Sequence, residues 1–504
     1  MKHLSRHITA LLMAVIAYAV LMLHADYLFA LQDNSVFISG HTFMRETLLY
    51  PTGLWAWLGC WFTQYFYYPW LGALIMVGLW LTTYYALTWA AEATSWTWCC
   101  CATLPQLFML YTLLCLGYWM FYSKSPGIAF VPTLVLTVAS LLTCAVVKLL
   151  KRLIHRSFRK LTYLVLIFLY IVLCPSLTTY SLRLPDHRLR SELRMYRAID
   201  ECRWADVLTE FSSEPDPTNL MVLYKNIALM HTGRLGEMFS TGNCGHQPKL
   251  PVRPFTSDTL RIYTSQLAGP MVYYQYGQFN FAHRWAIENS VEYGLSVRNL
   301  KTLVRCALMN QELDEAYRFI TLLKATRFHR NWAIRYEQML TNSTLLLQSE
   351  EFQNIAPLVD DDTNALDIDG GLPEKWLLEH FSDLANPSSP KLEDVVITTS
   401  LWAEDEYSFA IHFYNYTRRH PGEPIPRLYQ EGAILLCTQA DSPVTLDHFP
   451  FDQLVSDKYN SFVRDYNLLA EQRLSTEVMA ERLRPMYGDT YWWYYYFYSD
   501  FRIY

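Results

Sequence analysis

Glycine and proline are scarce in this chain of 504 residues, which holds 19 glycines and 23 prolines. A collagen-like chain needs glycine at every third position, and low-complexity disordered chains are rich in both residues, so both classes are excluded. Charged residues make up only 17% of the chain, and apolar residues make up 52%. This balance is rich in apolar residues for a soluble protein, yet too polar for a chain that lies wholly in a bilayer.

The chain also lacks the short motifs of the common catalytic and nucleotide sites. It has no His-Glu-x-x-His, Gly-x-Ser-x-Gly, Gly-x-Gly-x-x-Gly or phosphate-loop pattern. Ser388-x-x-Lys391 matches one nucleophile motif, but the companion motifs are missing, so we interpret the match as chance. We therefore predict no cofactor.

The cysteines and aspartates do not have the spacing of metal sites. Cys99, Cys100 and Cys101 are adjacent, and adjacent residues cannot present a tetrahedral zinc site. The acidic loop from Asp360 to Asp369 fails the EF-hand pattern because Ala365 stands where a glycine is needed. We predict no metal, no disulfide framework and, because the second half is net negative, no nucleic-acid partner.

Charge is distributed unevenly along the chain. Residues 1–184 hold 11 Lys/Arg against 4 Asp/Glu, whereas residues 185–504 hold 30 against 43. Nearly all the long apolar runs lie in the first of these segments. This asymmetry predicts a transmembrane domain over residues 1–184, followed by an extracytoplasmic helical domain over residues 185–504.

Five apolar runs are long enough to cross a hydrocarbon core of about 30 Å. They are Ile8–Leu31, Trp70–Ala91, Trp98–Phe121, Ile128–Leu150 and Leu161–Tyr180. The first run could instead be a cleaved signal peptide, but its length and the lack of a good cleavage site favour an anchor.

Positive charge sets the expected orientation of these spans. Lys148, Lys151, Arg152, Arg156, Arg159 and Lys160 crowd the link between the fourth and fifth spans. Such a link stays in the cytoplasm during insertion. With five spans, the N-terminus is then cytoplasmic, in agreement with Lys2 and Arg6, and everything after Tyr180 lies outside.

An aromatic segment from Leu54 to Trp70 ends the predicted outward loop between the first two spans. Aromatic rings suit the head-group zone, so this segment is expected to lie along the outer membrane interface. The alternative is an acceptor or lipid pocket, whose nearby charges are Asp26, Asp33, Arg45 and Glu46. Asp26 is the best placed of them, since a charge within the membrane boundary is costly and usually functional.

The second part of the chain shows helix-period apolar patterning without convincing alternating strands, which predicts an all-α fold. Tyr276-Gly-Gln-Phe-Asn-Phe-Ala282 and Asn310-Gln-Glu-Leu-Asp-Glu-Ala316 are similar and lie 34 residues apart, the tetratricopeptide period. The expected helix pairs cover about 190–233, 272–309, 311–340, 393–420 and 425–440. A non-repetitive helical domain is the alternative.

The aromatic run Tyr491–Tyr498 contains eight consecutive aromatic side chains, and exposing all of them to water would have a large free-energy cost. We expect this run to dock as the last helix or edge of the repeat stack. A contact with the membrane surface or with a partner is the alternative.

Three segments carry a resemblance to an uncharacterised family of bacterial multi-pass membrane proteins. They are Gln64-Tyr-Phe-Tyr-Tyr-Pro-Trp-Leu-Gly72, Ala228-Leu-Met-His-Thr-Gly-Arg-Leu235 and Gly488-Asp-Thr-Tyr-Trp492. The resemblance implies a bacterial multi-pass membrane architecture. Together with the charge distribution, it predicts the bacterial inner membrane, with the C-terminal domain periplasmic or otherwise extracytoplasmic.

The order of first span, acidic outward loop and interfacial helix is also similar to that of C-type glycosyltransferases, which use lipid-linked sugars. That similarity implies an acidic catalytic residue at Asp26, and Glu46 is a second candidate.

Two functions follow as hypotheses. The first is a non-catalytic, membrane-anchored scaffold that is embedded in lipid and holds a protein or glycan-assembly partner on the concave face of its helical repeats. The second is a transferase that acts on a lipid-linked substrate at the outer membrane face, with Asp26 or Glu46 taking a proton from the acceptor.

Overall fold

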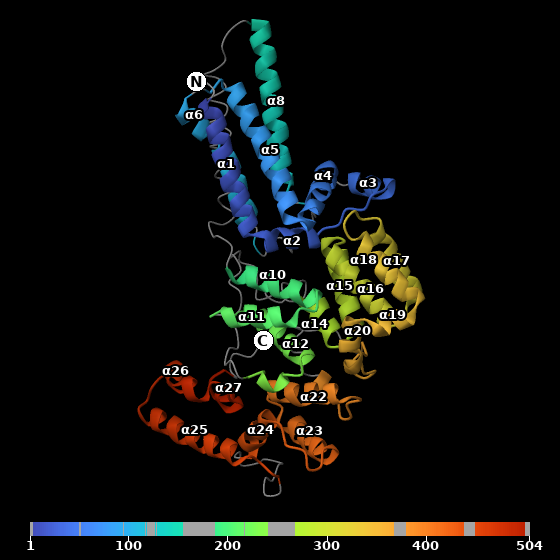
Figure 1. The fold of residues 1–504 in the computed structure, drawn as a ribbon, viewed down its shortest axis with the longest axis vertical. Helices are drawn as coiled ribbons and strands as arrows, with labels where there is room; N and C mark the ends of the chain where they lie inside the picture. The colour runs from blue at the N-terminus through green and yellow to red at the C-terminus, as the bar shows by residue number, and fades with distance from the viewer. Residues whose placement is uncertain are drawn as a thin grey trace. The chain divides into compact units, whose positions relative to one another are not determined.

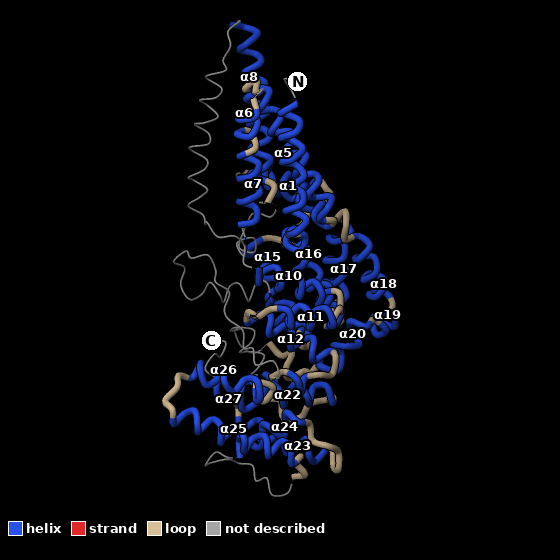
Figure 2. Tube along the Cα trace, turned by 60° about the vertical axis from the view of Figure 1, so that its left-hand side comes forward, coloured by secondary structure: helices blue, strands red, loops and turns tan. Residues whose placement is uncertain are grey.

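The computed structural model contains helices joined by turns and loops, and no strand occurs among the residues it describes (Figures 1 and 2). The described residues are 4–49, 52–93, 95–115, 117, 127, 129–154, 187–215, 217–239, 268–366, 380–437 and 449–498. The predicted all-α class, with apolar helices first and further helices after them, is confirmed.

The chain folds as two compact units that are each discontinuous in sequence. The first unit holds residues 1–193, 250–254 and 286–341, and the second holds residues 194–249, 255–285 and 342–504. Helices in the 297–341 region therefore belong to the same unit as the apolar N-terminal helices. The division at residue 184 into transmembrane and extracytoplasmic parts stays a prediction.

The helices of the first unit are α1 Leu4–Leu23, α2 Ala25–Asp33, α3 His41–Leu48, α4 Gly53–Thr63, η1 Gln64–Tyr67, α5 Pro69–Ala90, α6 Trp96–Cys101, α7 Leu104–Cys115, α8 Val131–Ile154, α16 Val297–Met309, α17 Leu313–Lys324 and α18 Arg330–Thr341. Those of the second unit are α11 Trp204–Ser213, α12 Asn219–His231, η3 Leu235–Glu237, α14 Gly269–Gln275, α19 Ser343–Gln348, α20 Glu350–Ile355, η5 Ala356–Leu358, α22 Pro390–Ala403, α23 Glu406–Arg419, α24 Arg427–Cys437, α25 Gln453–Glu471, α26 Thr476–Tyr487 and α27 Tyr491–Tyr498. The residues of α10 His187–Asp200 and α15 Phe279–Tyr293 are divided between the two units by these ranges.

Four described segments are long and apolar enough to cross a membrane: Leu4–Leu23, Pro69–Ala90, Trp96–Cys115 and Val131–Leu149. They correspond to the first four predicted spans. The fifth predicted span, residues 161–180, and the basic residues Arg156, Arg159 and Lys160 lie outside the described residues.

The predicted first span, Ile8–Leu31, is wrong as a single helix. Helix α1 ends at Leu23, and α2 begins at Ala25. The break falls at His24, whose imidazole Nδ1 lies 2.9 Å from the Val20 carbonyl oxygen. Asp26 then occupies the first turn of α2, where a carboxylate interacts favourably with the helix dipole. The polar residues at this point outweigh the apolar periodicity that continues on both sides.

Small and hydroxyl side chains bring the apolar helices together. Helices α1, α5 and α8 lie side by side in Figures 1 and 2. The indole N–H of Trp80 donates to the Thr133 hydroxyl over 3.1 Å, and the hydroxyls of Thr83 and Thr137 lie 3.1 Å apart. Such interhelical hydrogen bonds satisfy buried polar groups, and they fix the register of α5 against α8.

Arg6 holds the turn that follows α5. Its guanidinium is buried and donates to the Ala93 carbonyl oxygen over 2.7 Å, while the Tyr84 hydroxyl donates to the Arg6 carbonyl oxygen over 3.1 Å. A cation beside the carbonyl end of a helix satisfies groups that have no partner within the helix. Arg6 thus has a structural role in the first unit.

Six helix ends in the described part of the chain share one turn geometry. In each, one residue adopts a left-handed backbone: Glu92, Cys202, Gly233, Gly277, Gln311 and Glu404. The next N–H donates to the carbonyl five residues earlier, as in Glu312 to Ala307 (2.8 Å) and Gln278 to Tyr273 (2.9 Å). This is the Schellman pattern, which satisfies the last carbonyls of a helix and reverses the chain into the next one. The two similar sequences 34 residues apart are therefore the same turn.

Replacing Gln311 by glycine is expected to raise the free energy of unfolding by about 1 kcal/mol, because a left-handed backbone is costly for residues with a Cβ and free for glycine. Gly277→Ala should have the opposite sign, since its φ is +79° and an added Cβ would lie 3.0 Å from the Leu358 carbonyl. Gly236→Ala, which meets nothing within 4 Å, is the control. Denaturant unfolding of the detergent-solubilised protein measures all three. Equal stability of the Gln311 and Gly277 variants would contradict the prediction.

The aromatic run Tyr491–Tyr498 is helix α27, and it packs against α24 and α26. Trp492 and Trp493 are fully buried, and the indole N–H of Trp493 donates to the Ala480 carbonyl oxygen over 3.2 Å. The prediction that this run docks as a helix is confirmed, and the repeat stack that it was expected to close stays a prediction.

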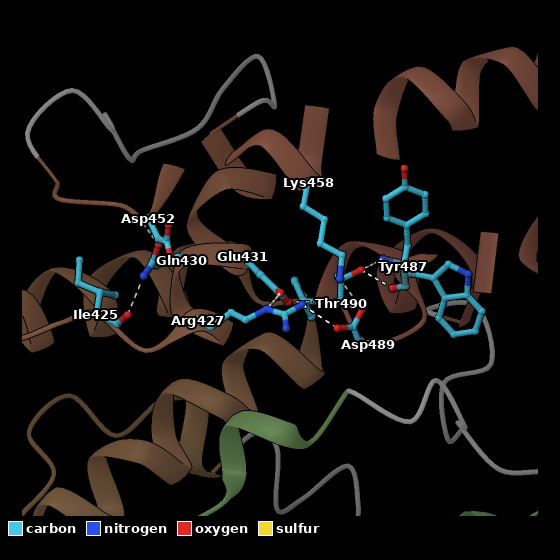
Figure 3. Close-up of polar contacts among 11 residues, drawn as sticks. Ile425, Arg427, Gln430, Glu431, Asp452, Lys458, Tyr487, Asp489 and Thr490 are labelled. Carbon is cyan, nitrogen blue, oxygen red and sulfur yellow. Dashed lines mark hydrogen bonds and ion pairs between the residues drawn. The ribbon is translucent and has the colours of Figure 1, made fainter. Parts of the chain in front are cut away.

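A polar network holds the start of α27 to α24 and α25 (Figure 3). The buried Glu431 carboxylate accepts from the Tyr491 backbone N–H over 2.8 Å and from the Arg427 Nε over 2.7 Å. Arg427 and Lys458 both donate to the Asp489 carboxylate, over 3.0 and 2.7 Å. Charged groups thereby satisfy the first N–H of an otherwise apolar helix.

Candidate functional site

The two carboxylates proposed from the sequence lie on different helices. Asp26 is half-buried in the first turn of α2, directly after the first apolar helix. Glu46 lies on α3, is exposed, and pairs with the neighbouring Arg45 over 3.4 Å. An exposed pair of this kind contributes little to stability. Neither environment singles out a proton acceptor.

The aromatic segment that precedes α5 makes protein contacts within the first unit. The Tyr67 ring stacks on Phe328 at 5.3 Å with an angle of 5° between the planes, and it meets His329 edge-on at 5.1 Å. The Gln32 amide nitrogen lies 2.7 Å from the buried His329 Nε2. This role was not predicted from the sequence, because Phe328 lies far along the chain from Tyr67. The position of the segment relative to a membrane stays a prediction.

A pocket of about 680 Å³ lies on the second unit, along helix α23. Its lining comes from α23, from the loop between α23 and α24, and from a short segment before α25. The lining residues are Tyr407, Ala410, Ile411, Phe413, Tyr414, Asn415, Tyr416, Thr417, Arg418, His420, Gly422, Glu423, Ile425, Phe449 and Pro450. A pocket of this volume lies within the usual range for small-molecule sites, roughly 300–1,000 Å³.

Helix α23 turns an aromatic face toward the pocket. Tyr407, Ile411 and Tyr414 are spaced at four and three residues, so they share one side of the helix. Tyr407 is 70% exposed and Tyr414 is 55% exposed, although both rings are large. The Arg418 guanidinium lies 5.8 Å from the centre of the Tyr414 ring. This face therefore offers aromatic rings and a cation to solvent.

His420 lies at the base of the pocket between two carboxylates. Its Nε2 lies 3.0 Å from Glu393, and its Nδ1 lies 3.1 Å from Glu423. The buried Glu393 also accepts from Arg419 over 2.8 Å. The hydrogen bond to Glu393 raises the pKa of His420, and Glu423 adds to the effect. The charges at the base of the pocket thus largely compensate one another.

Two tyrosines and a third carboxylate, that of Asp394, lie next to this group of residues. The Tyr416 ring stacks on the imidazole at 4.5 Å, and it meets Tyr429 edge-on at 5.2 Å. The Tyr429 hydroxyl donates to Asp394 over 2.7 Å. Burial raises the pKa of Asp394 despite this hydrogen bond. These contacts fix the imidazole plane and give the pocket a preformed base.

From the sequence, this region was predicted only as helix pairs over about 393–420 and 425–440. The tyrosine spacing on α23 was a usable signal, because two large rings on one helix face are normally buried. The pairing of Glu393 with His420 left no such signal, since Glu393 lies on α22 and His420 directly follows the end of α23.

Lys391 makes contacts different from those its motif match would require. Its ammonium donates to the Asn354 carbonyl oxygen over 2.6 Å and lies 3.1 Å from the Nδ1 of His231, which stacks on Trp204. Burial lowers the pKa of Lys391 to about 8 and that of His231 to about 3. Ser388 is exposed. Lys391 is therefore part of a buried packing contact in the second unit.

Comparison with known proteins gives a family and no activity. No curated protein and no solved structure matches the chain. One family model, described as a family of unknown function, DUF6057, matches residues 1–184 and 117–498. These two matches together cover nearly the whole chain, so the protein belongs to the DUF6057 family.

Proposed function

We propose that this protein is a membrane-anchored binding protein whose second unit is presented outside the cytoplasm to bind a partner. The observation that carries the proposal is the preformed pocket along α23, with two tyrosine rings left exposed beside it. Exposed aromatic side chains gathered at a concavity are typical of binding sites. The anchor would be the apolar helices of the first unit, embedded in lipid.

The repeated Schellman turns support a tetratricopeptide-like reading of the helical part. Stacked helical hairpins are commonly used to hold partners rather than to perform chemistry. The predicted location is the bacterial inner membrane, with the N-terminus in the cytoplasm and residues 185–504, which include the second unit, in the periplasm or otherwise outside the cytoplasm. The basic residues from Lys148 onward support this orientation.

Reporter fusions test the orientation. Alkaline phosphatase fused after Tyr504 is expected to be active, because that enzyme folds only outside the cytoplasm, and a green fluorescent protein fused there should stay dark. The matched control places both reporters directly after Arg152, where the opposite pattern is expected. Fluorescence at Tyr504 without phosphatase activity would overturn the extracytoplasmic proposal.

A transferase of the C-type glycosyltransferase kind is the second candidate, and the position of Asp26 favours it. Asp26 begins α2 directly after an apolar helix, at the place where such an enzyme holds an acidic residue. In a deletion strain, complementation by Asp26→Ala and Glu46→Ala, together with failure of a Tyr407→Ala/Tyr414→Ala variant, would exclude the enzyme. The reverse pattern would exclude the binding protein.

A further inference from the structure

We infer that the α23 pocket binds a neutral oligosaccharide, with Tyr407 and Tyr414 as the rings on which sugar units stack. This inference rests on the proposed function and names the ligand class for the same pocket. Its first support is the pair of exposed rings, because the C–H faces of sugars carry a partial positive charge and suit the negative face of an aromatic ring.

The second support is the set of polar groups beside those rings. Asn415, Arg418 and Glu423 all line the pocket. Amide, guanidinium and carboxylate groups are planar and offer two donors or two acceptors side by side, which match neighbouring hydroxyls on a sugar. A purely apolar ligand would strip these groups of water without replacing the lost hydrogen bonds.

The charge balance of the pocket selects against ionic ligands. Arg418 and His420 line it together with Glu423, and the carboxylate of Glu393 compensates His420 and Arg419 from behind. A phosphate or uronate would meet the Glu423 carboxylate, and a polycation would meet Arg418. A ligand that carries many hydroxyls and no net charge meets neither penalty.

The shape of the site favours a chain over a single sugar. The two exposed tyrosines are seven residues apart, two turns of one helix, so their rings follow each other along the pocket. A helix from a protein partner would bind best in a groove lined with aliphatic side chains, whereas this pocket is lined mainly with aromatic and polar ones. An extended glycan can place successive rings on successive tyrosines.

Calorimetric titration of the full-length protein in detergent tests the inference. The probes are cellohexaose, maltohexaose, mannohexaose and the hexamer of N-acetylglucosamine, with hexagalacturonate as the anionic comparison. We expect at least one neutral probe to bind. Tyr414→Ala should weaken that binding about tenfold and Tyr407→Ala should act in the same direction, because stacking on the ring is lost. Tyr414→Phe should bind nearly as the natural protein does, since the ring is kept.

Tyr317→Ala is the matched control, because Tyr317 is 52% exposed on helix α17 of the first unit and should not affect binding. Circular dichroism verifies that each variant folds. Failure of every neutral probe to bind, affinities of the Tyr407→Ala and Tyr414→Ala variants equal to that of the natural protein, or tighter binding of hexagalacturonate would each overturn the inference. So would conversion of a dimer to a monomer by Tyr414→Ala without any glycan binding. None of these outcomes would affect the reporter fusions that test the proposed function.

Discussion

Replacing Trp492 by alanine is expected to lower the free energy of opening of the C-terminal helices by about 3–5 kcal/mol, the usual cost of removing a large aromatic side chain from a core. Trp492 is fully buried and meets Tyr459 edge-on at 5.2 Å, with Phe462 at 6.4 Å. Alanine would leave a cavity that α25 could close only in part. Hydrogen exchange of residues 453–498, followed by mass spectrometry on the detergent-solubilised protein, measures the loss.

Two further substitutions in α27 sharpen this prediction. The Trp492 indole N–H has no hydrogen-bond partner among the described residues, so Trp492→Phe should cost much less than Trp492→Ala. Tyr496→Ala, at a partly exposed position of the same helix, should also cost less. Exchange rates that are unchanged in Trp492→Ala, or equal in all three variants, would show that α27 does not hold the core as described.

We expect the free energy of unfolding of the natural protein, relative to that of a Glu431→Gln variant, to fall by about 2 kcal/mol as the pH rises from 4 to 7.5. Burial raises the pKa of Glu431 from 4.5 to about 6, although the Tyr491 N–H and Arg427 act against burial. Because the folded-state pKa is the higher one, the folded state binds the proton more tightly. The resulting stability is complete below pH 4.5 and is lost as the pH rises through 6.

The comparison with Glu431→Gln is needed because Asp489 titrates in the opposite sense. Burial raises its pKa, but the hydrogen bonds from Lys458 and Arg427 outweigh burial and lower it. Asp489 therefore contributes stability at neutral pH that is lost in acid. Denaturant unfolding at several pH values isolates Glu431 as the difference between the two proteins. A difference that stays constant from pH 4 to pH 7.5 would contradict the assigned direction.

The sequence predicted the features that depend on local composition. Four apolar helices, the all-α class and the docking of Tyr491–Tyr498 follow from the hydrophobic content of single segments. The similarity of the turns at Gly277 and Gln311 was also readable, because the Schellman geometry is set by a few neighbouring residues.

The features that the sequence did not predict depend on contacts between distant segments. Helix α1 ends at Leu23 because polar residues interrupt an apolar run, and the apolar pattern alone conceals that break. The contact of Tyr67 with Phe328 joins residues that share no local pattern. The base of the α23 pocket requires Glu393 on α22 to meet His420 just after α23, and their pairing depends on how these two helices pack.

The order of residues in the α24–α27 network has a consequence for synthesis. Tyr491 leaves the ribosome 60 residues after Glu431, whose carboxylate accepts a hydrogen bond from the Tyr491 backbone N–H. Until then the Glu431 side chain lacks the backbone partner that helps to satisfy it, and the surfaces of α24 and α26 that α27 covers stay uncovered. Helices α24 to α27 should therefore pack together only after α27 has been synthesised. Before then, chaperones that shield apolar surface would bind α24 to α26.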